Sequence, residues 1–202
     1  MTEEKIRFLS KGLLIEGLVC IQEGEKGVVI THPHSLYGGT MYNQVVETLV
    51  EVYQDKGFST LRFNFRGVEG SEGSYDEGKG EQEDVRSALR YMYEREKRNI
   101  DLAGYSFGAW VNAKINDNHS LCNRIVMISP PVAFLDFSFL SFNPKIRLVV
   151  AGGKDDIAPA DKIKNDINVW NPKAYFEVIE GADHFYTDRI DSLKSILSRF
   201  IS

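Results

Sequence analysis

The stretch of sequence that decides the fold is residues 100–109, Ile100-Asp101-Leu102-Ala103-Gly104-Tyr105-Ser106-Phe107-Gly108-Ala109. Its apolar first part predicts a strand, and the residues after Ser106 predict a helix. Between them, Gly104-Tyr105-Ser106-Phe107-Gly108 fits G-x-S-x-G, a pattern in which the serine occupies a sharp, strained strand-to-helix turn. Glycines two positions before and after leave space for neighbouring backbone, so the Ser106 hydroxyl is expected to project above the sheet.

A serine hydroxyl is a weak nucleophile unless a base removes its proton, so chemistry at Ser106 requires a histidine and a carboxylate. Asp155 follows the apolar strand expected at 148–151, and His184 follows the strand expected at 176–179. Each residue stands at the carboxyl end of its strand, in the chain order serine, aspartate, histidine. Three loops can therefore converge on one crevice, and Ser106, Asp155 and His184 are predicted as the catalytic residues.

The rest of the chain alternates between strands and helices. After an amphipathic opening, turn signals and apolar runs predict strands at 13–21, 28–30, 58–65, 99–104, 124–129, 146–151 and 174–179. Apolar residues at helical spacing predict helices at 41–56 and 81–97, after Ser106, after Pro159 and at 190–200. This alternation is typical of the α/β class, in which helices cover both faces of a mostly parallel sheet and ligands bind at the strands' carboxyl ends.

The composition indicates one globular domain spanning residues 1–202. Hydrophobic residues make up 43% of the chain and aromatic residues 11%, which is enough to build a core. The net charge is −5 and acids and bases are mixed along the chain, so neither nucleic acid nor a membrane surface is an expected partner. No apolar run suits a membrane span or a signal peptide, which favours a cytoplasmic location.

The spacing of cysteines and histidines predicts no disulfide and no metal site. Cys20 and Cys122 lie far apart without a CxxC partner and are expected to be small buried core residues. His32 and His34 could share one face of an extended segment, but no third ligand stands at a telling distance. His119, in a polar stretch, is expected to be a solvated loop residue.

Residues 67–80 hold five glycines and many acidic residues, which predicts a long flexible loop. The spacing Gly67-x-x-Gly70-x-x-Gly73 is not the G-x-G-x-x-G pattern that opens a helix around a phosphate. No nucleotide cofactor is therefore predicted.

Three further motifs carry a resemblance to a known family. Residues 155–159, DDIAP, are similar to a D-x-(I/V)-(V/A)-P segment, and residues 62–73 resemble an R-G-x-G-x-S-x-G loop. Residues 32–41, HPHSLYGGTM, resemble the H-P-H-P-x-x-G-G-x-M segment of bacterial dienelactone-hydrolase-like and carboxylesterase-like proteins, with Ser35 in place of the usual proline. Over nearly its whole length the chain resembles a small, lid-poor serine hydrolase of the α/β-hydrolase superfamily.

The resemblance implies roles for the residues around the nucleophile. It places one N–H of an oxyanion hole on His34 and the second on Phe107, and His32 is expected to order its loop by hydrogen bonding. It assigns the acid position to Asp155 and leaves Asp156 to cap free N–H groups ahead of the next helix. The third carboxylate nearby, Asp183, is expected to be a turn residue.

Residues 131–142 lie where many superfamily members insert a helical cap, and the segment is too short for one. Its large apolar side chains are Phe134, Leu135, Phe137, Phe139, Leu140 and Phe142. Core packing against the sheet edge is expected for most of them, with one or two reaching the substrate pocket. The segment could also form a subunit contact in a homodimer.

The expected function is hydrolysis of a small ester or thioester through an acyl-enzyme, with no cofactor. Ser106 attacks the carbonyl, His184 removes and returns the proton, and Asp155 fixes the imidazole tautomer. The same machinery would serve a short-peptide or amide hydrolase, so this alternative stays open. The alternative from another class is a non-catalytic binding scaffold that keeps the fold.

Overall fold

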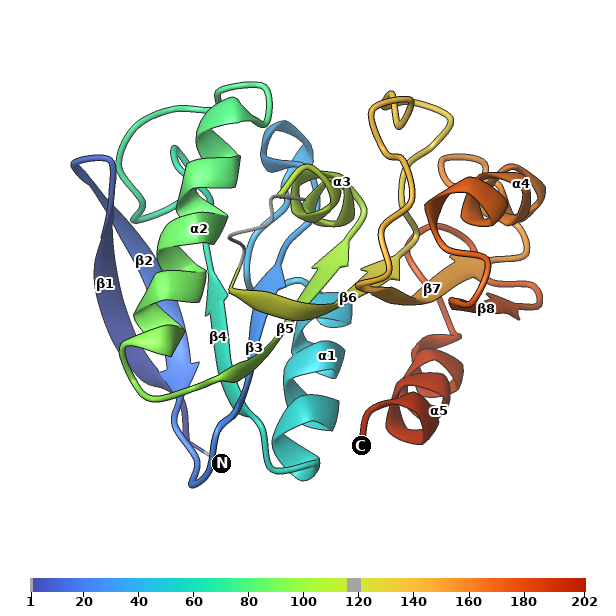
Figure 1. The fold of residues 1–202 in the computed structure, drawn as a ribbon. Helices are drawn as coiled ribbons and strands as arrows, with labels where there is room; N and C mark the ends of the chain where they lie inside the picture. Colours follow the sequence, from blue (N-terminus) through green and yellow to red (C-terminus); the bar gives the residue numbers. More distant parts are fainter. Residues whose placement is uncertain (1, 116–120) are drawn as a thin grey trace.

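A central sheet of eight strands organises the described part of the chain. The computed structural model describes residues 2–115 and 121–202, and His119 lies outside the described residues. The strand order is β1-β2-β4-β3-β5-β6-β7-β8 (Figure 1). The strands are β1 (Glu4–Ser10), β2 (Leu13–Cys20), β3 (Lys26–Thr31), β4 (Ser59–Phe63), β5 (Asn99–Tyr105), β6 (Cys122–Ile128), β7 (Ile146–Gly152) and β8 (Tyr175–Ile179).

The pairing confirms a mostly parallel sheet. Neighbouring strands from β4 to β8 run parallel, whereas β2 runs antiparallel to β4 and to β1. The sequence pattern indicated only an amphipathic opening where β1 forms, and in this edge strand only Phe8 and Ser10 are buried. In contrast, Val28, Val29 and Ile30 of β3 are fully buried, as expected for a strand covered on both faces.

Helices cover both faces of the sheet, as predicted (Figure 1). On one face, α1 (Gln44–Asp55) and α5 (Ile190–Phe200) pack side chains such as Leu49 and Leu197 into one apolar cluster. On the other, α2 (Lys79–Tyr93), α3 (Phe107–Ala113) and α4 (Ala160–Trp170) contribute Leu89, Val111 and Ile163 to a second cluster. Burying apolar side chains in both layers is the main stabilisation of this architecture.

The first helix begins three residues later than predicted because its N-terminus is capped. The Asn43 side chain accepts a hydrogen bond from the Val45 N–H at 2.9 Å, so α1 begins at Gln44 rather than at Met41. Its end agrees with the prediction, since Gly57 has a positive φ of 78° just beyond the helix.

Cys20 and Cys122 are both buried, which confirms the interpretation of both as core residues. Among residues 2–115 and 121–202, no helix has the length and apolar character that a bilayer crossing requires.

The glycine-rich segment after β4 is a loop, as predicted, and side-chain hydrogen bonds attach it to β2. The Glu72 carboxylate accepts from the Leu14 N–H at 2.8 Å. The Ser71 hydroxyl accepts from the Glu16 N–H at 3.1 Å and donates to the Asn64 carbonyl at 2.7 Å. The two contacts with β2 join residues more than 50 positions apart, and the loop composition alone gave no sign of them.

The phenylalanine-rich segment is less buried than predicted. Phe137 and Leu140 lie in the core, and the Phe137 ring packs on Trp170 of α4 with 5.1 Å between ring centroids. Phe134, Phe139 and Phe142 are 72%, 38% and 60% exposed and Leu135 is only partly buried, so the expectation of core packing for most of these six side chains is wrong. The connection from β6 to β7 contains no helix, so no cap covers this edge of the sheet in the described residues.

We predict a large difference in stability between two alanine variants of this segment. Phe137→Ala should lower the free energy of unfolding by about 3 to 5 kcal/mol, because it removes a buried ring and leaves a cavity against Trp170. Phe142→Ala should change it by less than about 0.5 kcal/mol, because this ring is mainly in solvent. Urea unfolding of both variants measures the difference, and equal losses would contradict the burial described here.

Candidate active site

Ser106 occupies the sharp turn between β5 and α3. Its backbone has φ 54° and ψ −119°, a strained combination for a residue with a side chain. A Cβ at Gly104 would lie 2.7 Å from the Ala109 backbone nitrogen, and one at Gly108 would lie 2.7 Å from the Thr31 carbonyl oxygen. The two glycines are therefore required by close backbone approach, as the G-x-S-x-G pattern predicts.

A chain of hydrogen bonds runs from Ser106 to a histidine and an aspartate on two other loops. The Ser106 Oγ lies 2.9 Å from the His184 Nε2. The His184 Nδ1 lies 2.9 Å and 2.8 Å from the two carboxylate oxygens of Asp155. All three side chains are buried, at 7%, 7% and 4% relative exposure. The structure thus brings together the three residues that the sequence analysis selected from three separate strand ends.

Asp155 takes the position against His184, and its neighbour does not. Asp156 is exposed, and the N–H groups ahead of α4 that it was expected to cap are bound by Asp155 instead. The Asp155 Oδ1 accepts from the Ile157 N–H at 3.0 Å and from the Ala158 N–H at 2.7 Å. The capping expectation for Asp156 is therefore wrong, because the first carboxylate of the turn reaches both the histidine and the backbone.

The surroundings of Asp155 favour its ionised form. Burial acts to raise the pKa of this carboxyl, but hydrogen bonds from the His184 ring and the Ala158 N–H outweigh burial and hold the pKa below its usual value. Asp183, adjacent to the histidine, accepts from the Thr187 N–H at 2.9 Å and is a turn residue, as predicted.

His32 orders the loop that follows β3. Its ring is fully buried, donates from Nδ1 to the Pro33 carbonyl at 2.6 Å and accepts at Nε2 from the Phe65 N–H at 3.0 Å. Burial lowers the pKa of His32 to about 4, so the ring is neutral near neutral pH. The expectation that His32 orders its loop by hydrogen bonding is confirmed.

The neutral state of His32 leads to a prediction about stability at acidic pH. The unfolded chain takes up a proton on this ring below about pH 6.5, whereas the folded chain resists doing so until about pH 4. Stability should therefore fall as the pH drops through this window, by up to about 3 kcal/mol from His32 alone.

A comparison with His32→Gln isolates this contribution. The glutamine amide oxygen can accept the Phe65 N–H but does not titrate, so its free energy of unfolding should fall less between pH 6.5 and 4 than that of the wild type. Urea unfolding at several pH values measures both curves, and parallel curves would contradict the prediction.

His34 and Phe107 lie beside each other next to Ser106. Their ring centroids are 4.6 Å apart. Within the described residues, no hydrogen bond uses the backbone N–H of His34 or that of Phe107. The His34 Nδ1 accepts from the Leu36 N–H at 3.2 Å, its Nε2 lies 3.3 Å from the Tyr75 hydroxyl, and burial lowers the pKa of its ring.

Sequence analysis did not single out three buried hydroxyl groups around this site. The Tyr105 hydroxyl donates to the His184 carbonyl at 2.8 Å, and the hydroxyls of Ser129 and Tyr186 lie 2.9 Å apart. Tyr105 adjoins the nucleophile and Tyr186 follows His184 by two positions, so nearness in sequence to predicted site residues was an available signal for both. Ser129 had no such signal.

Outside the candidate active site, the described residues form no cluster of metal ligands, and they enclose a cavity near α5. Among the described residues, no three His, Cys, Asp or Glu side chains cluster as metal ligands would.

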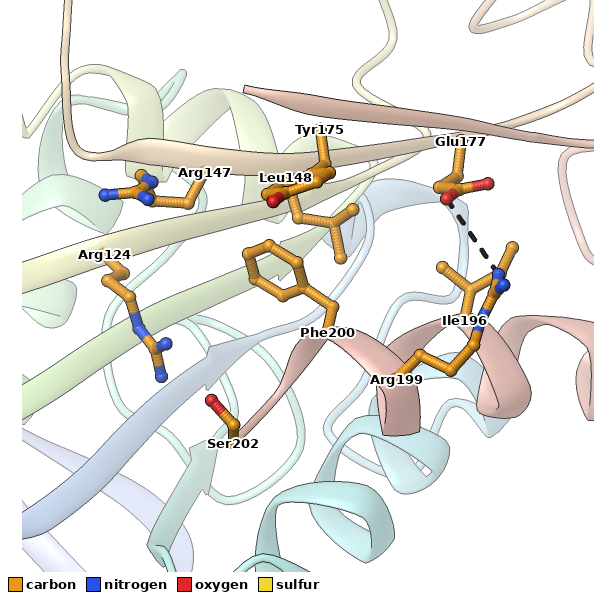
Figure 2. Close-up of a pocket in the computed structure, with 9 residues that line it drawn as sticks. All are labelled: Arg124, Arg147, Leu148, Tyr175, Glu177, Ile196, Arg199, Phe200 and Ser202. Atoms are coloured by element: carbon orange, nitrogen blue, oxygen red, sulfur yellow. Dashed lines mark ion pairs between the residues drawn. The ribbon is translucent and has the colours of Figure 1, made fainter. Parts of the chain in front are cut away.

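A cavity of about 500 Å³ lies between the last strands and α5, where Arg124, Arg147 and Arg199 line it with apolar neighbours (Figure 2). Asp101 pairs with Arg124 at 2.7 Å, and Glu177 lies 3.9 Å from Arg199 (Figure 2).

Comparison with known proteins identifies one relative by sequence. No protein-family profile matches the chain. An uncharacterized protein of Rickettsia prowazekii is 34% identical over 184 residues, which cover 86% of this chain and 77% of that protein.

Solved structures extend the similarity to three dimensions. An α/β serine hydrolase homologue from Coxiella burnetii is 34% identical, covers 100% of this chain and 99% of its own, and has a TM-score of 0.92. An α/β serine hydrolase without a lid from Xanthomonas campestris is 26% identical, with 98% and 93% coverage and a TM-score of 0.89. The predicted α/β-hydrolase fold without a large cap domain is thus confirmed, and the chain belongs to the α/β serine hydrolase family.

Proposed function

We propose that this protein hydrolyses a small ester or thioester through an acyl-enzyme formed on Ser106. The observation that carries the proposal is the continuous hydrogen-bonded path from the Ser106 Oγ through the His184 ring to the Asp155 carboxylate, with distances of 2.9 Å and 2.8 Å. Because the carboxylate only accepts hydrogen bonds, the His184 Nδ1 carries the proton and its Nε2 is free to accept the proton of the serine.

In the acylation step, the Ser106 Oγ forms a bond to the carbonyl carbon while its proton moves to the His184 Nε2. The carbonyl oxygen becomes negatively charged and accepts hydrogen bonds from the backbone N–H groups of Phe107 and His34. The α3 N-terminus adds a favourable dipole at that point. Collapse of this intermediate breaks the bond to the leaving oxygen or sulfur, which takes the proton from His184.

Deacylation repeats the sequence with water as the nucleophile. The His184 Nε2 removes a proton from water, the hydroxide oxygen bonds to the acyl carbon, and the ester bond to Ser106 breaks as the proton returns to its Oγ. Asp155 stabilises the imidazolium formed in both steps. The chemistry uses no cofactor.

The open site favours a small substrate with an apolar group. No cap covers the nucleophile in the described residues, and the rings of His34, Tyr75, Phe107 and Trp110 lie in contact beside it. Apolar and aromatic walls with a few placed polar groups are usual for small-molecule sites. We assign the protein to the dienelactone-hydrolase-like, carboxylesterase-like group on the motif at 32–41.

A fluorophosphonate probe tests the proposal, because it reacts covalently with an activated serine. The folded wild type should be labelled at one site, identified as Ser106 by mass spectrometry of the peptides, and Ser106→Ala should not be labelled. The matched control is Ser192→Ala, which changes an exposed serine on α5 and should be labelled like the wild type. Absence of labelling in folded wild type would favour the binding scaffold.

A substrate panel then separates the hydrolase classes. Esters of graded acyl length, acyl thioesters, lactones and aminoacyl amides are compared by kcat/KM, the quantity that defines specificity. We expect short esters or thioesters to give the highest values, and a clear preference for amides would replace the esterase assignment with a peptidase assignment.

A further inference from the structure

Phe185 is an exposed ring that contacts the histidine of the candidate active site. Among the described residues, two aromatic rings lie against the His184 imidazole: Tyr105, with 5.4 Å between ring centroids, and Phe185, with 5.7 Å. Tyr105 is 1% exposed and belongs to the core, whereas Phe185 is 66% exposed. Of these two rings beside the imidazole, a bound molecule can therefore reach only Phe185.

The loop that carries Phe185 is held in place on both sides of this ring. Its neighbours His184 and Tyr186 are both buried. The Tyr186 N–H donates to the Asp183 carbonyl at 3.2 Å, and the Thr187 N–H donates to the Asp183 carboxylate at 2.9 Å. Because buried side chains and these hydrogen bonds hold the backbone, the loop presents Phe185 to solvent at a fixed place beside the imidazole.

The chemistry at His184 determines which part of a substrate lies here. The His184 Nε2 is 2.9 Å from the Ser106 Oγ. When the intermediate collapses, this nitrogen gives its proton to the leaving oxygen or sulfur, so that atom must come within hydrogen-bond distance of the imidazole. The carbonyl oxygen, in contrast, accepts from the backbone N–H groups of Phe107 and His34 in the proposed mechanism. The group attached to the leaving atom is therefore the part of the substrate that lies next to His184 and can reach Phe185.

We propose that Phe185 forms an apolar subsite for the leaving group, and that the preferred substrates are esters of aromatic or benzylic alcohols. This inference rests on the proposed hydrolase function and adds the class of the alcohol to it. An aromatic ring on the alcohol can pack against Phe185 and bury apolar surface that otherwise stays in water. A methyl ester has no group that could make this contact, so it gains nothing from Phe185.

The occupant of this subsite is a small molecule rather than a protein. A protein surface lying on Phe185 would also cover the approach to the imidazole that the ring contacts, and an ester could then not reach Ser106. The alcohol part of an ester, in contrast, arrives together with the carbonyl and departs when the acyl-enzyme has formed.

A comparison of two esters in two proteins tests the subsite. Benzyl acetate and methyl acetate share an acyl group and have leaving alcohols of similar acidity, so they differ mainly in the ring. Phe185→Ala should lower kcat/KM for benzyl acetate by about 10-fold relative to methyl acetate, because the contact between the rings is lost. Phe185→Leu keeps an apolar side chain and should keep most of the preference for benzyl acetate.

The matched control is Tyr93→Ala, which removes an exposed ring at the end of α2 and should leave the ratio of the two kcat/KM values unchanged. The substituted side chain in Phe185→Ala is mainly in solvent, so this variant should fold like the wild type. If Phe185→Ala leaves the ratio at the wild-type value, the inference is wrong.

The two half-reactions distinguish a leaving-group subsite from a ring that only shields His184. The leaving alcohol is gone once the acetyl group is on Ser106, whereas deacylation still uses the His184 Nε2. Rapid mixing with 4-nitrophenyl acetate measures both steps, as a burst of 4-nitrophenol followed by steady turnover. In Phe185→Ala we expect slower acylation at subsaturating ester and a deacylation rate constant within about twofold of the wild type. A fall of both rate constants by the same factor would show that Phe185 acts on the histidine, which would overturn the inference.

Binding of a product alcohol tests the subsite without turnover. 2-Naphthol is an aromatic alcohol whose own fluorescence changes when it leaves water, so a titration with protein gives its dissociation constant. It should bind about 10-fold more weakly to Phe185→Ala than to the wild type. The same result with a wild type that hydrolyses no ester would remove the proposed function and leave the aromatic subsite. Ester hydrolysis by the wild type, with equal 2-naphthol binding in both proteins, would remove the subsite alone.

Discussion

Ser106→Ala is expected to lower kcat for ester hydrolysis by about 10⁵ to 10⁶-fold, the largest effect of any single change in this protein. The alanine has no oxygen to form the acyl-enzyme, while His184 and Asp155 keep their mutual hydrogen bonds. The free energy of unfolding should change little, since the replaced hydroxyl contributes one hydrogen bond to the fold.

Initial rates with 4-nitrophenyl acetate at saturating substrate measure this effect, and Ser192→Ala serves as the control. Residual hydrolysis at a hundredth of the wild-type rate or more, in a preparation free of wild-type protein, would show that another group is the nucleophile. The same rates distinguish a hydrolase from a binding scaffold, because a binding scaffold would show no turnover in the wild type or in Ser106→Ala.

Asp155→Asn is expected to lower kcat by about 10⁴-fold, while Asp156→Asn stays within twofold of the wild type. The physical reason lies in the donors that hold the carboxylate. The N–H groups of Ile157 and Ala158 bind the Oδ1, so an asparagine at 155 keeps its amide oxygen there and turns its NH₂ group toward His184. The imidazole must then accept at Nδ1, which places its proton on Nε2, where it can no longer take the proton of Ser106.

Steady-state kinetics of both variants and their urea unfolding test this ranking. The unfolding measurement is needed because Asp155 also caps the turn before α4. If the variant is folded at the assay temperature, its loss of activity is not caused by unfolding. Equal losses of kcat in Asp155→Asn and Asp156→Asn, or the reverse ranking, would contradict the assignment of the acid.

Local features of the sequence predicted much of the site. Gly104 and Gly108 mark a place where backbone segments approach too closely for a Cβ, so the elbow was predictable from five residues. Asp155 and His184 could be selected because strand ends are visible as the end of an apolar run. The choice between Asp155 and Asp156 rested on a resemblance alone. The two carboxylates are neighbours in one turn, and the pattern of apolar runs cannot say which of two adjacent residues faces the histidine.

Sequence by itself thus determined the class of the fold, the position of the nucleophile and the three loops that carry the site, because alternation, periodicity and close-packed glycines are local properties. Only the tertiary structure decided the strand order, the exposure of Phe134 and Phe142, the capping of the turn before α4 by Asp155, and the hydrogen bond between Ser129 and Tyr186. The physical reason is that a hydrogen bond between residues 29 or 57 positions apart depends on the distance between strand ends across the sheet, which no local pattern records.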